Sequence, residues 1–589
     1  MATELHLRRY GAAPDARANS IESFRRLAAD ACGREDVTVL LGGGAYLLGD
    51  ALGMAGFERF MHSALPGMNW ADPPDYAPYP FGTAMCFDSC RNLTVDGEGA
   101  VLVMRGFTRP ARFANCTGVL TVRNLTIDWD RPFYSIGEIV AARPRATGEE
   151  GGYLDVRVLD EFPVSGGEPV HIFQEYEPGT LRPMRREFMG LESSELIAPQ
   201  TLRLNMKRRF QVEPGNAACL RHPHYCFNNL DFAHNEQIVL ADVTVHASGG
   251  FGFGGSHNHD VTATRVRIVP RPGTRRMMSS NHDGMSFGAG RGTVTYRSCA
   301  FEGMGDDCAG ASGDSGRHAY VREVLDAHTL VAYFRNYHHV QVSGNSHCPL
   351  PGEDLLFTDL EGMDLDYWNG TVRAASLDPG TGTMRITFHE RIPDAVAPNH
   401  VFNNTSYSYR LRYDGCHFGP NRSRGAITST SDVLIENCRF DRSGGTATYV
   451  STELYWEVSR GRHDITIRNN TYHDCGKAAG NMGSHAIAVD ATGFGLYGHQ
   501  DDYGPAGFHR NILIEGNTIA GDGVAVSLCS AEDVVVRNNR IEGSNPAITL
   551  HNCRNVRIEG NALPSGAGAG ASEAVKIGSG CDRRSITIR

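Results

Sequence analysis

Three aspartates in the middle of the chain have the residue type and spacing that acid–base catalysis needs. Asp283 lies in the segment NHDGMSFGAG, and Asp306 and Asp307 lie in GMGDDCAGASG, about 23 residues later. Carboxylates gathered in one small patch repel one another, so at least one of them has a raised pKa. A hydrolase needs carboxyl groups of different pKa, because one carboxylic acid donates a proton while another carboxylate accepts one. The alternative is that Asp-Gly and Asp-Asp are turn residues.

Five other residues are candidates for sugar contacts. Asp128 and Trp129 end the strand-like segment LTIDW, where an aromatic face suits the CH face of a sugar and a carboxylate suits its hydroxyls. Trp456 and Glu457 lie in a long turn between repeats. Arg424, in NRSRG, is expected to bind a hydroxyl or to hold a carboxylate ionised. The structural alternatives are ordinary packing for Trp129 and a solvated surface position for Arg424.

We expect no metal and no cofactor. The pairs His222/His224 and His257/His259 have same-face spacing, but no set of Cys, His and Asp completes a site around them. The sequence has no glycine-rich phosphate loop, no Gly-x-Ser-x-Gly elbow and no CxxC pair.

A repeated strand pattern predicts how these residues are positioned. It occurs as VLIENCRF, ITIRNNTY, ILIEGNTI, VVVRNNRI and VRIEGNAL, and the last three copies are about 22 residues apart. Short β-branched strands at this period indicate a right-handed parallel β-helix, whose coils stack about 4.8 Å apart. The spacing of Asp283 and Asp306 is close to one coil, so we expect them at equivalent positions on neighbouring coils. One column of the repeat is expected to stack at a bend in a structural role: Cys438, Asn470, Asn517, Asn539 and Asn561.

Two stretches interrupt the repeat and alternate like antiparallel strands, for example YLDVRVL and GTMRITF. An Asn19-x-x-Glu22 capping box and apolar residues at helical spacing predict a helix that caps the first coil. The fold class is therefore all-β, a parallel β-helix with an N-terminal capping helix and two inserted antiparallel β domains. The expected domains are 1–135 (cap and first coils), 136–216 (insertion), 217–320 (coils with the aspartates), 321–410 (second insertion) and 411–589 (C-terminal coils).

Composition argues against two classes of binding partner. The net charge is −11, and no long Lys/Arg run or 20-residue apolar stretch occurs, so neither nucleic acid nor a membrane is an expected partner. Fifteen scattered Cys fit buried thiols better than a disulfide framework. The first residues show no signal-peptide core, which predicts a cytoplasmic protein, or a secreted one if a leader was removed. A monomer or homodimer is expected.

The aspartate segments resemble the catalytic region of glycoside hydrolase family 110, the inverting exo-α-1,3-galactosidases that act on blood-group-B-type ends. LTIDWDRP, CHFGPNRSRG and YWE come in the order of that family. The sequence differs from the family pattern at residues 281–284, where Asn-His-Asp-Gly replaces His-Asp-Asp-Gly. It differs again at residues 312–313, where Ser-Gly replaces His-Gly.

This resemblance implies an exo-acting hydrolase of terminal α-linked galactose. It assigns Asp306 as the general acid, and Asp283 and Asp307 as the pair that holds the attacking water. In inverting enzymes acid and base are roughly 6.5–9.5 Å apart. The first alternative is a polygalacturonase-like enzyme, although the later Gly-His-Gly and Arg-Ile-Lys motifs of that family are missing. The second alternative is a non-catalytic β-helix that binds carbohydrate.

Overall fold

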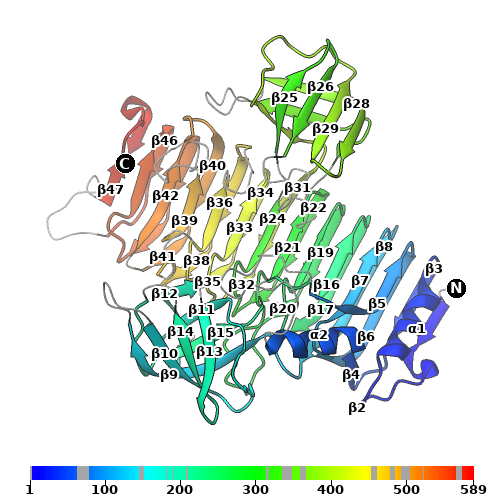
Figure 1. Ribbon diagram of the computed structural model, residues 1–589. Coiled ribbons are helices and arrows are strands. Elements are labelled where there is room, and N and C mark those ends of the chain that lie inside the picture. The colour runs from blue at the N-terminus through cyan, green and yellow to red at the C-terminus, as the bar shows by residue number, and fades with distance from the viewer. Residues whose placement is uncertain are drawn as a thin grey trace.

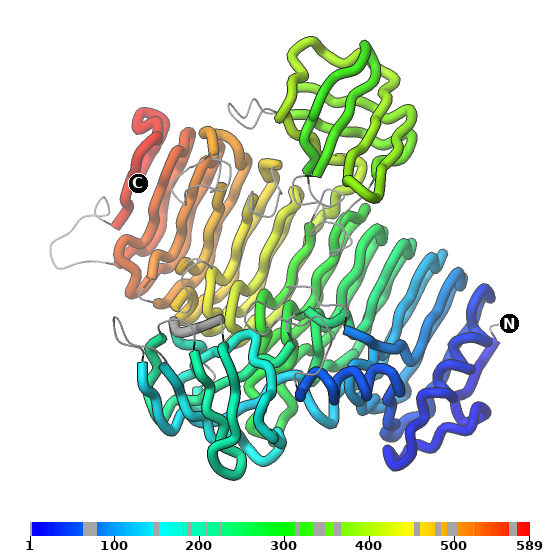
Figure 2. Tube along the Cα trace, in the orientation of Figure 1, coloured from blue at the N-terminus to red at the C-terminus, as the bar shows by residue number. Residues whose placement is uncertain are grey.

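The chain forms one long stack of parallel coils from which two β units project (Figure 1). Consecutive coils lie side by side from the N-terminal to the C-terminal end, as the tube in Figure 2 shows. The computed structural model describes residues 3–62, 79–144, 152–180, 182–189, 191–206, 210–223, 225–312, 318–334, 348–358, 367–452, 460–477, 484–491, 504–521, 523–564 and 574–589.

Two parallel sheets build the stack within these residues. The larger, sheet A, contains β1 (Thr3–His6), β2 (Asp15–Asn19), β3 (Glu35–Leu40), β4 (Ala45–Gly49), β6 (Arg91–Arg105), β8 (Val119–Trp129), β17 (Gln237–Val245), β19 (Asp260–Thr264), β20 (Arg267–Ile268), β22 (Arg291–Arg297), β23 (Ala300–Phe301), β31 (Ser408–Asp414), β32 (His417–Phe418), β34 (Val433–Glu436), β35 (Arg439–Asp441), β37 (His463–Arg468), β38 (Thr471–His473), β40 (His509–Glu515), β41 (Thr518–Ala520), β43 (Ala531–Arg537), β44 (Arg540–Glu542), β46 (Arg554–Glu559) and β48 (Ile586–Ile588). Sheet B contains β5 (Gly82–Asp88), β7 (Thr108–Ala114), β16 (Leu230–Ala233), β18 (Phe253–Ser256), β21 (Met285–Gly288), β24 (Ala309–Ser312), β33 (Ala426–Ser429), β36 (Thr448–Ser451), β39 (His485–Asp490), β42 (Val524–Cys529), β45 (Ile548–His551) and β47 (Val575–Ile577).

Each coil buries alternate side chains inside the stack. In β34 the apolar side chains of Val433 and Ile435 are buried, and those of the next strands along the stack continue the same columns. Aromatic rings stack in the same way: Phe418 lies 4.5 Å from Phe440, which lies 4.7 Å from Tyr472, with nearly parallel planes. These spacings match the rise of about 4.8 Å between paired strands. The core is therefore a set of ladders rather than a globular centre.

The predicted Asn column is confirmed as a structural ladder. The backbone N–H of Asn470 donates to Asn517 Oδ1 at 3.0 Å, and that of Asn517 donates to Asn539 Oδ1 at 2.9 Å. The side-chain Nδ2 of Asn517 donates to Ile467 O and to Asn539 Oδ1. The left-handed residue is not the ladder residue but the one before it, for example Asn469 with φ 55°. The ladder Asn instead supplies donors and acceptors that pair each buried bend with the next.

Helix α1 (Ile21–Ala31) caps the first coils, as predicted, and α2 (Ala51–Met61) follows it. The buried face of α1 includes Phe24, whose ring packs edge-on against Tyr46 at 5.4 Å. The predicted capping box does not form. Asn19 Oδ1 accepts the N–H of Ile21, while Glu22 pairs with Arg25. Two short 3-10 turns, Leu7–Tyr10 and Arg583–Ser585, complete the helical elements of the described residues.

The two projecting units are antiparallel and each has its own apolar core. The first unit is a sheet of β9 (Tyr134–Arg143), β10 (Gly152–Val158), β11 (Ile172–Tyr176), β12 (Pro183–Met189), β13 (Leu191–Ala198), β14 (Thr201–Met206) and β15 (Ala217–Arg221). The second unit is a closed barrel of β25 (Ala319–Val324), β26 (Thr329–Tyr333), β27 (Asp354–Thr358), β28 (Trp368–Asp378), β29 (Thr383–Phe388) and β30 (Val401–Asn404). The predicted fold class is therefore confirmed.

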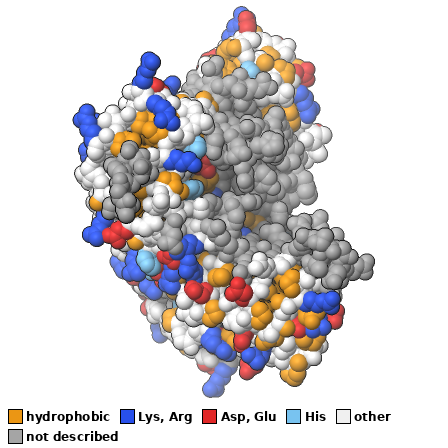
Figure 3. Space-filling model, turned by 90° about the vertical axis from the view of Figure 1, so that its left-hand side faces the viewer, with side chains coloured by type: hydrophobic (Ala, Val, Ile, Leu, Met, Phe, Trp, Pro, Cys, Tyr) orange, Lys and Arg blue, Asp and Glu red, His pale blue; other side chains and the backbone are white. Residues whose placement is uncertain are grey.

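The first unit rests on coils that come much later in the chain. Arg442 donates to Thr180 O at 2.7 Å, and Arg182 pairs with Asp474 at 3.3 Å. In the side view of Figure 3, the barrel is at the top and the first unit is at the bottom of the face shown. Basic and acidic side chains are intermixed over this face.

Among the described residues, no helix has the length and apolar character needed to cross a bilayer. All fifteen Cys are free, and ten of them are buried.

Candidate active site

The candidate site forms where three successive coils bend just before they enter sheet B. Met285 in β21 pairs with Ala309 in β24, and Ala309 pairs with Ala426 in β33. The first step is 24 residues (309 minus 285), one more than the spacing between Asp283 and Asp306. The expectation that these two aspartates are equivalent was therefore one residue out of register.

Two columns of side chains result from this register. Asp283, Asp307 and Arg424 occupy one column, each two residues before its strand. His282, Asp306 and Ser423 occupy the neighbouring column. Asp306 and Asp307 lie in the bend rather than in a regular strand, because β24 begins only at Ala309. Strand alternation therefore does not force their side chains to opposite faces.

Asp307 is the most firmly held of the three aspartates. Its Oδ1 accepts hydrogen bonds from Ser423 Oγ at 2.7 Å and from the backbone N–H and Nε–H of Arg424 at 3.0 Å each. The Arg424 guanidinium also lies 2.9 Å from Asp307 Oδ2. Burial raises the pKa of Asp307, Arg424 opposes the rise, and Asp306 and Asp283 add to it, so that the pKa reaches about 6. Arg424 thus contacts a carboxylate and opposes the rise of its pKa, and its predicted role in the site stays a prediction.

Asp306 and Asp283 face outward more than Asp307 does. Their side chains are 16% and 15% exposed, against 7% for Asp307, so these two can reach a substrate. Asp306 Oδ1 lies 3.5 Å from the buried guanidinium of Arg422. Burial alone raises the pKa of Asp306, but Arg422, His282 and Arg424 outweigh it and hold the pKa below its ordinary value.

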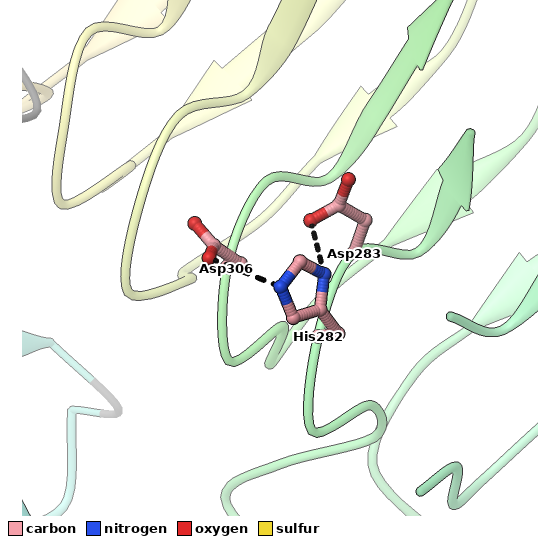
Figure 4. Close-up of side chains that lie close together, drawn as sticks. All are labelled: His282, Asp283 and Asp306. Carbon is pink, nitrogen blue, oxygen red and sulfur yellow. Dashed lines mark ion pairs between the residues drawn. The ribbon is translucent and has the colours of Figure 1, made fainter. Parts of the chain in front are cut away.

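His282 lies between the two outward carboxylates and was not predicted from the sequence. Its Nδ1 is 2.9 Å from Asp283 Oδ1, and its Nε2 is 3.5 Å from Asp306 Oδ2 (Figure 4). The imidazole packs against the rings of Tyr225 and Phe251, with centroids 3.5 and 4.7 Å away. Burial lowers the pKa of His282 to about 3, so the ring is neutral near pH 7. A neutral His282 carries no charge to lower the pKa of Asp306, so near pH 7 the arginines are what keep that pKa low.

Two buried arginines fix the bends that hold the aspartates. Arg221, the last residue of β15 in the first projecting unit, donates to Gly305 O at 2.8 Å and to Asn281 O. Arg422 also donates to Gly305 O at 2.8 Å. A Cβ at Gly305 would meet Asn281 O at 2.4 Å and Arg221 Cζ at 3.0 Å, so the close contact requires glycine here. Through Arg221, the first projecting unit therefore stabilises both bends that carry the aspartates.

The ligand atoms of His282, Asp283 and Asp306 lie within 4.8 Å of one another, close enough to share a cation. The charge around them opposes one. Arg422 already pairs with Asp306, and Arg221 and Arg422 lower the pKa of His282 by their positive charge. A divalent cation would sit against two guanidinium groups, so the residues present do not fit a metal. The absence of a metal site stays a prediction.

The other predicted sugar-binding residues are placed differently. Trp129 is fully buried; its Nε1 donates to Gly106 O at 3.0 Å and its ring packs against Phe133. Asp128 is 3% exposed and pairs with Arg276, which corrects the prediction that it contacts a sugar. Trp129 is corrected as well, because it offers no free face. Trp456 and Glu457 lie outside the described residues, and their role stays a prediction.

The chain is similar to several curated α-1,3-galactosidases over most of its length. It is 23% identical to α-1,3-galactosidase B of Bacteroides thetaiotaomicron over 533 residues, covering 86% of this chain and 81% of that protein. It is 27% identical to α-1,3-galactosidase A of Bacteroides fragilis over 442 residues, covering 72% and 70%. For α-1,3-galactosidase A of Shewanella woodyi the identity is 23%, covering 72% and 69%. No model of a known protein family matches the chain.

Solved structures give weaker likenesses. The family 28 exopolygalacturonase of Yersinia enterocolitica has a TM-score of 0.42 at 12% identity, covering 99% of this chain and 79% of that one. The exopolygalacturonase of Thermotoga maritima has a TM-score of 0.39 at 11% identity, covering 96% and 88%. Scores this low carry no weight in the assignment. The sequence relatives do, and they confirm the predicted resemblance: over most of its length the chain is similar to proteins named α-1,3-galactosidase.

Proposed function

We propose that the protein is an exo-acting, inverting glycoside hydrolase that releases terminal α-linked galactose, with α-1,3 as the expected linkage. One observation carries this proposal: three carboxylates from adjacent coils gather at one bend, two of them partly exposed and the third held by Arg424 and Ser423. The names of the relatives supply the substrate class, because each is called an α-1,3-galactosidase.

In the proposed mechanism Asp306 is the general acid, since it is exposed enough to reach the glycosidic oxygen. It gives its proton to that oxygen as the bond to the anomeric carbon breaks. Asp283 and Asp307 hold a water on the opposite face, and one of them accepts the proton that the water loses as its oxygen attacks. A bound sugar covers Asp306 and excludes water, which raises the pKa of a carboxyl group. Substrate binding thereby offsets the effect of Arg422.

A substrate panel tests the activity. The purified protein is incubated with p-nitrophenyl α- and β-glycosides, with α-1,3-, α-1,4- and α-1,6-galactosyl oligosaccharides, and with polygalacturonate. We expect galactose release from α-galactosides, fastest from the α-1,3 linkage, and none from the Asp306→Asn variant. Cleavage of polygalacturonate alone would favour the polygalacturonase-like alternative. No turnover of any glycoside, with a folded protein, would favour a carbohydrate-binding role.

A further inference from the structure

We propose that Tyr225 and Phe251 form an aromatic platform that binds the hydroxyl-poor face of the terminal galactose, beside the three aspartates. This inference rests on the proposed function and names a sugar-binding subsite within it. The two rings come from the two coils that precede Asp283 along the stack. They therefore lie at one end of the row of carboxylates.

The strand register places Phe251 next to Asp283. Phe253, the first residue of β18, pairs with Met285, the first residue of β21. Phe251 and Asp283 each lie two residues before these positions, so they occupy one column on neighbouring coils. The backbone N–H of Gly252 also donates to Asp283 O at 3.1 Å. The column of carboxylates therefore continues with a phenyl ring on its N-terminal side.

Tyr225 completes the platform. Its ring centroid lies 6.3 Å from that of Phe251, and both rings pack against the imidazole of His282, at 3.5 and 4.7 Å. Both side chains are partly exposed, whereas the rings inside the stack, such as Phe253 and Phe287, are fully buried. Two partly exposed rings beside outward carboxylates offer an apolar surface to a ligand.

The backbone holds the platform in place before any ligand arrives. The N–H of Asn229 donates to Phe251 O at 3.0 Å, and the N–H of Phe253 donates to Gly284 O at 2.9 Å. A Cβ on Gly252 would meet Gly284 O at 2.7 Å, so the bend is closely packed against the next coil. A ring fixed in this way costs little conformational entropy when a sugar binds to it.

The chemistry of the surface suits galactose. The axial O4 of galactose leaves the C–H groups of C3, C4 and C5 on one face, and an aromatic ring packs against such a face by dispersion and weak C–H contacts. In glucose the hydrogen on C4 points to the opposite face. At the other end of the column Arg424 follows the carboxylates. The site thus has an apolar end and a cationic end, and the apolar end favours galactose over glucose.

Four substitutions test the platform in the full-length protein. Phe251→Leu and Tyr225→Leu keep apolar bulk but remove the flat ring, while Phe251→Tyr and Tyr225→Phe keep a ring. For each Leu variant we expect KM for p-nitrophenyl α-galactoside to rise about 5- to 10-fold, with a smaller change in kcat. The preference for α-galactoside over α-glucoside in kcat/KM should fall by a similar factor. The variants that keep a ring should stay near the wild-type values.

Tyr10→Leu is the matched control. Tyr10 is also a partly exposed ring packed on the core, but it lies beside the capping helix, where its hydroxyl donates to Asp30 at 2.7 Å. This variant should lower the melting temperature without changing KM or the sugar preference. If the Leu variants at Tyr225 and Phe251 behave in the same way, the two rings only pack against His282 and the platform is wrong.

A binding measurement separates this inference from the proposed function. Methyl α-galactoside is added to the Asp306→Asn protein, and saturation-transfer difference NMR is recorded with irradiation of the aromatic protons. We expect the strongest transfer to H3, H4 and H5 of the sugar, and a Kd about 5- to 10-fold higher when Phe251→Leu is added. An unchanged Kd would overturn the platform alone, even if the wild-type protein cleaves galactosides. Binding through these protons without any cleavage by the wild-type protein would overturn only the proposed hydrolysis. Neither binding nor cleavage would overturn both.

Discussion

Two bends of the same solenoid stack side chains in columns, but with opposite electrostatic consequences. At the bend before strands β38, β41 and β44, each Asn pairs its amide with the backbone and side chain of the next coil. At the bend before β21, β24 and β33, the columns hold carboxylates, an imidazole and guanidiniums. An amide offers a donor and an acceptor, so a column of identical amides is self-complementary. A column of carboxylates is not, and the charged bend needs Arg221, Arg422 and Arg424 to hold it together.

The largest effect is expected from Asp306→Asn at the charged bend. The amide is nearly isosteric, so the fold should persist while proton donation is lost and kcat/KM falls at least about 100-fold. Steady-state kinetics and a thermal melt check both parts. Asp414→Asn is the matched control, since Asp414 is exposed and its carboxylate accepts a hydrogen bond from Asn437 beside the Asn ladder. A variant that keeps more than about a tenth of kcat/KM, a loss below about 1.4 kcal/mol, would remove Asp306 from the mechanism.

The second-largest effect is expected in the pH dependence of activity at the charged bend. The pKa of Asp307 is about 6, and the proposed base must be ionised. On the acidic limb of the pH profile, activity should therefore fall as the pH drops through about 6. Arg424→Gln removes a cation that lowers this pKa, so the acidic limb should move to higher pH. An activity that instead falls as the pH rises through 6 would make Asp307 the acid.

The Asn ladder predicts the reverse pattern, a loss of stability without a loss of activity. Asn517→Ala leaves the buried N–H of Asn470 and the carbonyl of Ile467 without their partner. Each unsatisfied buried group costs about 1–3 kcal/mol, so the free energy of unfolding should fall by that order. Chemical denaturation measures the change, and kcat and KM should stay at the wild-type values. A normal stability would mean that backbone pairing alone holds the bend.

The smallest effect is expected from chelators. Because guanidinium groups surround His282, Asp283 and Asp306, EDTA should leave kcat/KM unchanged. The assay is run after extended dialysis against the chelator, with and without added Mg²⁺, Ca²⁺ or Zn²⁺. Activity lost in EDTA and restored by one of these ions would show that the trio holds a cation after all.

The sequence was informative where the repeat is regular. The 22-residue spacing was enough to predict the solenoid and its Asn ladder, because period and strand pattern repeat together. The register of the aspartates was missed by one residue, since the spacing of Asp283 and Asp306 was used instead of the strand starts at Met285 and Ala309. Aligning those starts with the start of β33 would also have pointed to Arg422 and Ser423.

Other parts of the site have no local signal. Arg221 comes from the first projecting unit and reaches Gly305 across 84 positions of the chain, a contact that only the tertiary structure reveals. Trp129 was assigned to a sugar because aromatic residues beside carboxylates suit both roles. Its actual partners, Gly106 and Phe133, lie in neighbouring turns that fill the space around the ring. Residue type alone could not distinguish a buried ring from an exposed one.

The stereochemistry of the first product tests the central claim most directly, because the charged bend is proposed to hold a water rather than to form a bond with the sugar. Proton NMR of an α-galactoside during its first turnovers shows which anomer is released before mutarotation. The proposed roles of Asp283, Asp306 and Asp307 predict the β-anomer first. Release of the α-anomer first would mean that one of these aspartates is a nucleophile and would contradict the account.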